Sequence, residues 1–130
     1  SKWKDEGTRT FLGIHTRGFP NLFLIAGPQG GGGSFNFTDA IDEHSEYVVW
    51  LLKTMRENGK NRVDVLEEPE AEYTEHCRMA DSSTRPLRDC VSYYNGHGDA
   101  QPGSLAYYGG GQWHKFRKRA QETLEPFIFA

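Results

Sequence analysis

Three patterns follow one another in the segment Gly18-Phe19-Pro20-Asn21-Leu22-Phe23-Leu24-Ile25-Ala26-Gly27-Pro28-Gln29-Gly30-Gly31-Gly32-Gly33-Ser34-Phe35-Asn36-Phe37-Thr38. Residues Leu22–Ala26 are continuously apolar, which predicts a short strand buried on both faces of a sheet. A glycine-rich loop follows at residues 27–34, and a helical pattern begins near Phe37. A strand, a glycine loop and a helix form half of an α/β unit, so we predict the α/β class.

The best helix of the chain is predicted to run from Phe37 to Glu57. Acidic residues crowd its first turns, where the helix dipole favours negative charge. Asn58-Gly59 is a typical end signal. Candidate capping residues are Ser34, Asn36 and Thr38. The predicted apolar face consists of Ile41, Val48, Leu52 and Met55, flanked by Val49, Trp50 and Leu51.

The rest of the chain predicts an irregular segment with two further helices. The expected elements are an edge strand at 62–66, a polar helix from Pro69 to Ala80, ordered coil from Asp81 to Pro102, a strand at Leu105–Tyr108 and a last helix from Gln112 to Leu124. The helix that starts at Gln112 should bury Trp113, Phe116, Ala120 and Leu124. The apolar end Pro126–Phe129 should dock on another part of the protein.

The composition excludes several classes of protein. A net charge of −3 over 130 residues argues against a nucleic-acid binder driven by bulk charge. No apolar run is long enough to cross a bilayer, and the first residues lack the apolar core of a secretory signal. The five histidines show no metal-ligand spacing, so we expect no metal site. Cys77 and Cys90 suit a reduced, cytoplasmic setting better than a disulfide that closes the residues between them.

The glycine loop at 27–34 permits three interpretations. It lacks the Gly-Lys-Ser/Thr of a phosphate loop, and its glycine run meets the dinucleotide fingerprint only trivially. Gly30–Ser34 is also the repeat unit of a flexible linker. Alternatively, glycines placed between a buried strand and a helix N-terminus let the backbone approach a ligand closely. Such a site suits a phosphate, or a heterocycle edge that gains negative charge.

Several segments in one order resemble flavin-dependent Baeyer–Villiger monooxygenases, over nearly the whole chain. Gly18–Phe23, Ala26-Gly27-Pro28 and Asn36 with its long helix and His44 resemble part of the C-terminal region of that family. The later likenesses are Ser92-Tyr93-Tyr94-Asn95-Gly96 and Tyr107-Tyr108-Gly109-Gly110. Trp3 and Arg9-Thr10-Phe11-Leu12-Gly13 also fit the family pattern.

The resemblance implies a partial C-terminal piece of a flavoprotein with two dinucleotide-binding domains. Residues 1–60 would be the C-terminal part of the FAD-binding domain, and residues 61–130 an extension that packs on the FAD and NADP domains. Such enzymes use FAD and NADPH to convert ketones to esters or lactones through a flavin C4a-peroxide. The implied partners are the remainder of the flavoenzyme and a ketone, with no nucleic acid and no membrane.

The resemblance also implies roles for individual residues. Gly27, Pro28, Asn36 and Phe37 would lie at the flavin, with the helix N-terminus directed at the flavin's pyrimidine edge. Gly32, Gly33, Ser34 and Phe35 would form a loop at the substrate pocket. Tyr93 would contact the nicotinamide cofactor. No residue of this chain is assigned a catalytic role.

Three departures from the family pattern carry expectations. Tyr93 replaces a tryptophan, and His97-Gly98 replaces Ala-Asn, which removes hydrogen bonds of that asparagine. The bare loop at 30–33 predicts a roomier pocket for bulky or macrocyclic ketones. The chain also lacks the nucleotide-binding glycine motif, the NADPH domain, the signature motif and the catalytic arginine. We therefore expect it to be a piece, or one chain of a split enzyme, and inactive and unable to retain FAD alone.

The rival hypothesis is a non-enzymatic interaction module. In that case the acidic helix near 67–80 pairs with the basic helix near 113–124, and the glycine run is a flexible tether. Limited proteolysis would then cut first at 29–34, and deletion of two glycines would change little. If the loop lines a flavin site, the same deletion in the complete enzyme would abolish cofactor retention.

Overall fold

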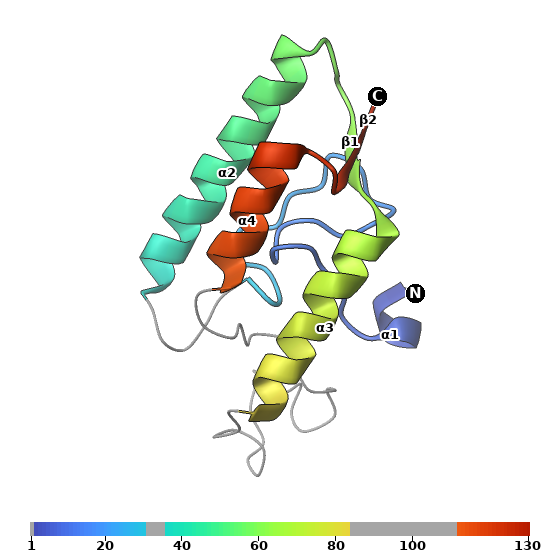
Figure 1. The fold of residues 1–130 in the computed structure, drawn as a ribbon, viewed down its shortest axis with the longest axis vertical. Coiled ribbons are helices and arrows are strands. Elements are labelled where there is room, and N and C mark those ends of the chain that lie inside the picture. Colours follow the sequence, from blue (N-terminus) through green and yellow to red (C-terminus); the bar gives the residue numbers. More distant parts are fainter. Residues whose placement is uncertain (1, 31–35, 84–111) are drawn as a thin grey trace.

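The computed structural model describes residues 2–30, 36–83 and 112–130. The elements in chain order are α1 (Lys2–Glu6), α2 (Phe37–Glu57), β1 (Val63–Val65), α3 (Glu67–Ser83), α4 (Gln112–Thr123) and β2 (Phe127–Phe129). Figure 1 shows the long helix α2 and the helix α3 on opposite sides of α4, with the N-terminal loops behind them. The pair β1–β2 lies at the end of the molecule from which α3 starts. The helices and the two-stranded sheet are compatible with part of an α/β protein.

Helix α2 has the bounds that the sequence predicts. Of the three candidate caps, Asn36 takes the role: its Oδ1 accepts a hydrogen bond from the Thr38 backbone N–H at 3.1 Å. At the other end Asn58 is the C-cap, and Gly59 has a φ of +64°. Glycine adopts this left-handed conformation without the Cβ strain of other residues, so the helix stops there.

The buried face of α2 differs from the predicted one. Leu51 and Met55 are buried, but Leu52 and Val49 are exposed, and Val48 is half-buried. The buried stripe is Ala40, His44, Tyr47, Leu51 and Met55. These positions follow one another at helical spacing, so the prediction erred because it gave no weight to the polar residues His44 and Tyr47 as core residues.

The predicted edge strand forms as β1, and the C-terminal segment docks on it as β2. Strand β1 pairs antiparallel with β2 in the register Val63–Phe129, Asp64–Ile128 and Val65–Phe127. Two backbone hydrogen bonds between Arg62 and Ala130 extend the ladder. Val63, Val65 and Phe127 are buried, whereas Ile128 faces outward.

The two later helices are confirmed with small shifts. Helix α3 starts two residues before Pro69, which keeps this proline in the first turn where its missing N–H has no intrahelical partner. Helix α4 buries Trp113 and Ala120, and Phe116 and Leu124 pack on the core as predicted. Helix α1 was not predicted. The coil predicted from Asp81 starts too early, because α3 continues to Ser83. The rest of that coil, to Pro102, and the strand expected at 105–108 lie outside the described residues.

The predicted strand at Leu22–Ala26 is wrong for this chain. The segment bends at residues 25–26, where Ala26 has a φ of +52°. Its backbone hydrogen bonds run from the Leu22 N–H to the Phe19 carbonyl at 3.2 Å and from the Leu24 N–H to the Ile14 carbonyl at 2.8 Å. A strand needs a neighbouring strand to satisfy both rows of backbone groups, and the described residues offer none here. Leu22 and Ile25 are exposed, so the expected burial on both faces is also absent in the chain taken alone.

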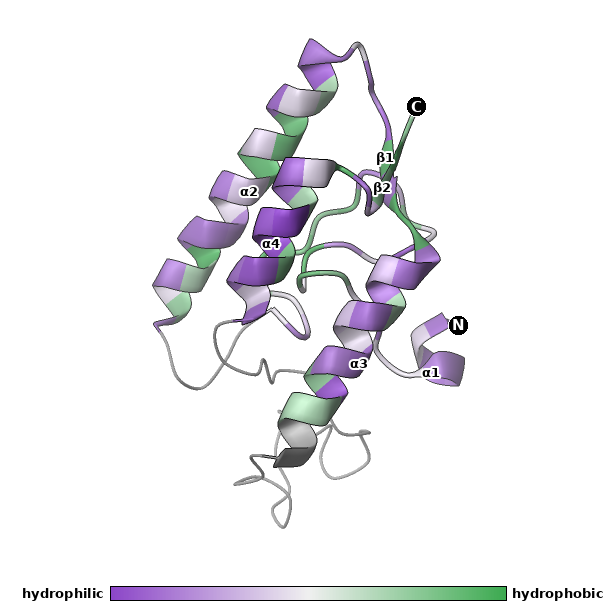
Figure 2. Cartoon of the chain, viewed as in Figure 1, coloured by the Kyte–Doolittle hydropathy of each residue, from purple (hydrophilic) through white to green (hydrophobic). Residues whose placement is uncertain are grey.

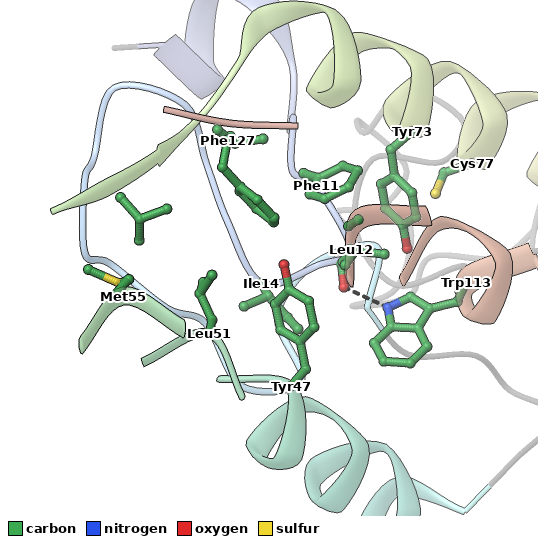
Figure 3. Packing of buried hydrophobic residues seen from close by; sticks show 13 residues of the cluster. Phe11, Leu12, Ile14, Tyr47, Leu51, Met55, Tyr73, Cys77, Trp113 and Phe127 are labelled. Atoms are coloured by element: carbon green, nitrogen blue, oxygen red, sulfur yellow. Dashed lines mark hydrogen bonds between the residues drawn. The ribbon is translucent and has the colours of Figure 1, made fainter. Parts of the chain in front are cut away.

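One hydrophobic core joins the two halves of the sequence. Figure 3 shows Phe11, Leu12 and Ile14 surrounded by residues of α2, α3, α4 and β2. The Phe11 ring meets Tyr73 and Phe127 edge-on, with centroids 5.9 and 6.2 Å apart. The division into 1–60 and 61–130 stays a prediction. Within the described ranges, no helix is long and apolar enough to cross a membrane.

Candidate functional site

The described part of the glycine loop packs directly on the N-terminal segment. Gly13, Gly27 and Gly30 approach one another so closely that we call them the glycine corner. A Cβ on Gly13 would lie 2.1 Å from the Gly30 Cα, and one on Gly27 would lie 2.6 Å from the Gly13 carbonyl oxygen. No side chain fits at either position. Gly13 also has a φ of +68°, which favours glycine.

Gln29 secures the loop from inside. Its side chain is fully buried: Oε1 accepts hydrogen bonds from the Thr10 N–H and hydroxyl at 3.1 and 2.7 Å, and Nε2 donates to the Thr8 carbonyl. Its own carbonyl accepts a 2.6 Å hydrogen bond from the Tyr73 hydroxyl of α3. Gln29 adopts a φ of +64°, an unfavourable conformation for a residue with a Cβ, and these bonds hold it there. The segment up to Gly30 is therefore fixed.

His44 joins the same corner to α2. Its Nδ1 accepts a hydrogen bond from the Ala26 N–H at 3.0 Å, and a Cβ on Gly30 would lie 2.7 Å from its Cε1. The ring stacks on Trp113 with a centroid distance of 5.3 Å and an interplanar angle of 17°. Burial lowers the pKa of His44 to about 4, so the ring is neutral at pH 7.

A second buried histidine, His15 of the N-terminal segment, packs against Tyr47 on the inner side of α2. His15 Nε2 is 3.0 Å from the Tyr47 hydroxyl, inside a group of aromatic rings. Burial lowers the pKa of His15 to about 3 and raises that of Tyr47 well above its usual value. Both groups are uncharged at neutral pH. They have no access to solvent and serve the core, not a proton-transfer step.

The predicted site residues divide into three groups. Gly27 and Pro28 belong to the fixed loop, where the Pro28 carbonyl accepts a hydrogen bond from the Thr10 hydroxyl at 3.2 Å. Asn36 and Phe37 start α2, about two helical turns before the corner contact at His44. The predicted residues Gly32, Gly33, Ser34, Phe35 and Tyr93 lie outside the described residues.

The N-terminus of α2 has the properties of a ligand-facing helix end. Asn36 caps the Thr38 N–H through its side chain, and the remaining N–H groups of the first turn have no partner within the helix. These groups and the helix dipole favour an electron-rich atom. Phe37 beside them is 63% exposed, an unusual position for a large aromatic side chain.

Ion pairs connect the basic helix α4 to both neighbouring helices. Arg117 pairs with Glu43 of α2, and Arg119 forms a two-point pair with Glu72 of α3, with the shorter contact at 2.6 Å. The hydrogen bonds from Arg119 lower the pKa of Glu72. The acidic and basic helices therefore do pair, as the interaction-module hypothesis requires. The pairing is internal, however, and residues 27–30 are packed. Residues 31–33 of the predicted tether lie outside the described residues.

Sequence reasoning missed one further polar centre. The Glu70 carboxylate is buried and accepts hydrogen bonds from Lys2 Nζ at 2.7 and 2.9 Å and from the Arg17 backbone N–H at 2.6 Å. It anchors α1 to α3. No local pattern could reveal a pair 68 residues apart. In the part of the chain that the structure describes, no cluster of histidine, cysteine and acidic residues could hold a metal ion.

Residues 27–30 are fixed beside α2, and a glycine-rich loop before a helix N-terminus is typical of α/β enzymes that bind nucleotide cofactors. Comparison with known proteins narrows the class. The Baeyer–Villiger monooxygenase peniC of Penicillium patulum is 32% identical over 112 residues, which cover 82% of this chain and 18% of that protein. Pentalenolactone D synthase of Streptomyces exfoliatus is 32% identical over 114 residues, 85% of this chain and 19% of the relative.

The fold agrees with these sequence relatives. The crystal structure of OTEMO in complex with FAD and NADP matches with a TM-score of 0.77 and 26% identity, over 97% of this chain and 23% of that one. No family model matches the chain. Over the segment that it covers, the chain belongs to the Baeyer–Villiger monooxygenase family. It spans about a fifth of the length of these relatives.

Proposed function

We propose that this chain is the C-terminal part of an FAD- and NADPH-dependent monooxygenase that converts ketones to esters or lactones. In this proposal α2 and the loop before it form one side of the flavin site, and the remaining polypeptide supplies the rest. The family membership supports the reaction class, and OTEMO, with FAD and NADP bound, supports the cofactors. A cytoplasmic location stays a prediction.

The observation that carries the proposal is a set of exposed apolar side chains on the segment that leads into the glycine corner and on α2. They are Phe19, Leu22, Ile25, Phe37, Val49 and Leu52. Figure 2 shows hydrophobic as well as hydrophilic residues along α2. The exposed part of this helix is mainly charged, with Val49 and Leu52 as apolar residues among the charges. Further polypeptide is expected to cover these residues.

The N-terminus of α2 fits a flavin, whereas Gly27 and Pro28 are used in contacts inside the chain. The first-turn N–H groups of α2 that lack an acceptor within the helix suit an electron-rich heterocycle edge, and exposed Phe37 offers an apolar contact beside it. Gly27 and Pro28 already use their close contacts inside the chain. Their role in our proposal is to fix the loop, and a direct flavin contact from either residue stays a prediction.

FAD and NADPH would supply the redox chemistry when bound, and the protein would supply position and exclusion of water. Asn36 would keep the α2 N-terminus intact, and the packed loop at 27–30 would set where that terminus points. The predicted contacts of Gly32, Gly33, Ser34 and Phe35 with a ketone, and of Tyr93 with the nicotinamide cofactor, remain part of the proposal. So does the roomier pocket for large ketones.

A matched pair of substitutions on α2 tests the flavin assignment in the complete enzyme. Phe37→Ala should weaken FAD retention about tenfold, because it removes an apolar contact at the helix N-terminus. Val49→Ala removes an exposed apolar residue about 18 Å further along the same helix and should leave retention unchanged. FAD retention after gel filtration, together with the flavin absorption spectrum, gives the result. Equal retention in the two variants would contradict the assignment.

The interaction-module hypothesis predicts different behaviour of the same loop. Deletion of two glycines from 30–33 would then leave FAD retention of the complete enzyme intact. Our proposal predicts loss of FAD, since the loop would connect the fixed corner to the flavin-facing helix. The 130-residue chain alone should not retain FAD under either hypothesis, so only the deletion in the complete enzyme discriminates between them.

A further inference from the structure

Two segments distant in sequence from α2, residues 26–30 and α4, meet at the ring of His44. The Ala26 N–H donates to its Nδ1, Gly30 touches its edge, and Trp113 of α4 covers one face. His44 is 1% exposed. The ring therefore sits where the start of the loop, the middle of the loop and the C-terminal helix are closest to α2.

The hydrogen bond to Ala26 defines the protonation state of the ring. A backbone N–H can only donate, so Nδ1 must carry a lone pair, and the single proton of the neutral ring must lie on Nε2. A protonated ring would place two donors face to face. The charged groups around the ring are Glu43 on α2 and Arg117 on α4, and they act on it in opposite directions. Residues 25–30 carry no titratable group.

Trp113 holds the ring in place and is itself fixed. Its Nε1–H donates to the Leu12 carbonyl at 2.9 Å, next to Gly13 of the glycine corner (Figure 3). The guanidinium of Arg117 lies over the other part of the same indole, 5.5 Å from its centroid. Helix α4 thus contacts the corner twice, directly through Leu12 and indirectly through the His44 ring.

We propose that His44 is a positioning residue, which as a neutral acceptor for the Ala26 N–H, held by the Trp113 stack, fixes the loop that leads into the proposed flavin site. Through this ring, α4 sets the geometry of the loop. The effect of His44 on the flavin site rests on the proposed function, but the contact between His44 and the loop can be tested separately.

Two amide variants of similar shape separate the hydrogen bond from simple packing. In His44→Asn the side-chain oxygen can take the place of Nδ1, whereas in His44→Gln the amide reaches the place of Nε2. The complete enzyme is compared by hydrogen exchange at 24–30 and at the middle of α2. We expect exchange at 24–30 to rise about fivefold in His44→Gln and to stay near the original rate in His44→Asn. His114→Asn, at an exposed histidine, is the control.

Each outcome has one meaning. Equal exchange at 24–30 in the Asn and Gln variants overturns the positioning role of His44, whatever happens to the flavin. Faster exchange in the Gln variant alone supports it. If that variant also loses FAD and shows a shifted flavin spectrum, the loop and the flavin site are coupled as proposed. If it keeps FAD with an unchanged spectrum, the positioning role stands and the proposed flavin site at α2 fails.

Discussion

One side of α2 is buried within this chain, and the opposite side is exposed. On the inner side Leu51 is fully buried and packs with Tyr47 and Met55 against the N-terminal core. On the outer side Leu52, the next residue, is 48% exposed, and Val49 is exposed as well. The inner side is buried by the chain's own folding. The outer side is mainly polar, and Val49 and Leu52 stand there among exposed residues such as Asp42, Glu46 and Lys53.

This difference shows which part of the fold the chain completes alone. The inner side packs against loops that are held by close glycine contacts and by hydrogen bonds of a buried glutamine and buried histidines. The outer side has no such contacts among the described residues, and it leaves the apolar side chains of Val49 and Leu52 exposed. The first three predictions below test this contrast between the inner and the outer side, and the fourth tests a surface contact away from α2, in order of decreasing expected effect.

Gly13→Ala should be the most damaging substitution on the inner side. The new Cβ would overlap the Gly30 backbone, which cannot rotate away, and alanine is strained at a φ of +68°. We expect a loss of about 4 kcal/mol of unfolding free energy. Gly59→Ala is the control: its φ is +64° but its Cβ meets nothing within 4 Å, so about 1 kcal/mol is expected. Urea denaturation measures both, and similar losses would refute the close packing of the corner.

Leu51→Ala and Leu52→Ala compare the two sides at adjacent residues. Leu51→Ala leaves a cavity in the core and should lower the unfolding free energy by about 3 kcal/mol. Leu52→Ala should cost less than about 1 kcal/mol in this chain. If further polypeptide covers the outer side, the Leu52→Ala effect should grow in the complete enzyme. An effect that stays the same in both would contradict that covering.

Low pH should weaken the inner side selectively. His15 and His44 stay neutral in the folded chain down to pH values of about 3 and 4, whereas in the unfolded chain both gain a proton below about 6.5. Folded pKa values that are lowered mean that stability falls as the pH drops below 6.5. The slope should be about 1.4 kcal/mol per pH unit for each histidine near pH 5.

Thermal or urea unfolding between pH 7.5 and 5 measures this slope. His44→Asn should reduce the slope by about half, whatever its effect at pH 7.5, since only His15 would remain. A slope that does not respond to the loss of His44 would show that this ring is not buried in its neutral form.

The ion pair between Glu72 and Arg119 should contribute least. It links α3 and α4 on the surface, away from both sides of α2, and both side chains are exposed. Solvent and salt screen such pairs, so the coupling between Glu72→Gln and Arg119→Gln should be below about 1 kcal/mol and should shrink at high salt. A double-mutant cycle measures it. A larger, salt-independent coupling would mean that this contact becomes buried.

The sequence predicted the helices well because their ends carry local signals. Asn36 and Asn58-Gly59 mark the two ends of α2, and Pro69 marks the start of α3 within two residues. The family resemblance was also correct. The strand at 22–26 failed for a non-local reason: an apolar run becomes a strand only when a partner offers backbone groups, and the run itself cannot show whether that partner exists.

The site was predictable in part. Its glycines and the start of α2 were visible because a glycine run before a capped helix is a local pattern. The support behind them was not visible, since Gln29 and His44 act through residues 18–21 positions away in sequence. One weak signal existed: Gln29 is the single polar residue between a proline and a run of glycines, where a buried amide could hold an otherwise flexible loop.

The bond between Trp113 and Leu12 also has a consequence for how the protein is made, because its two residues stand 101 positions apart. A ribosome adds about 5–20 residues per second, so about 5–20 s separate the synthesis of Leu12 from that of Trp113. During that time the nascent chain contains Leu12, Ala26 and Gln29, whose left-handed backbone is unfavourable without later contacts. The glycine corner is therefore expected to close late, after translation of the last helix.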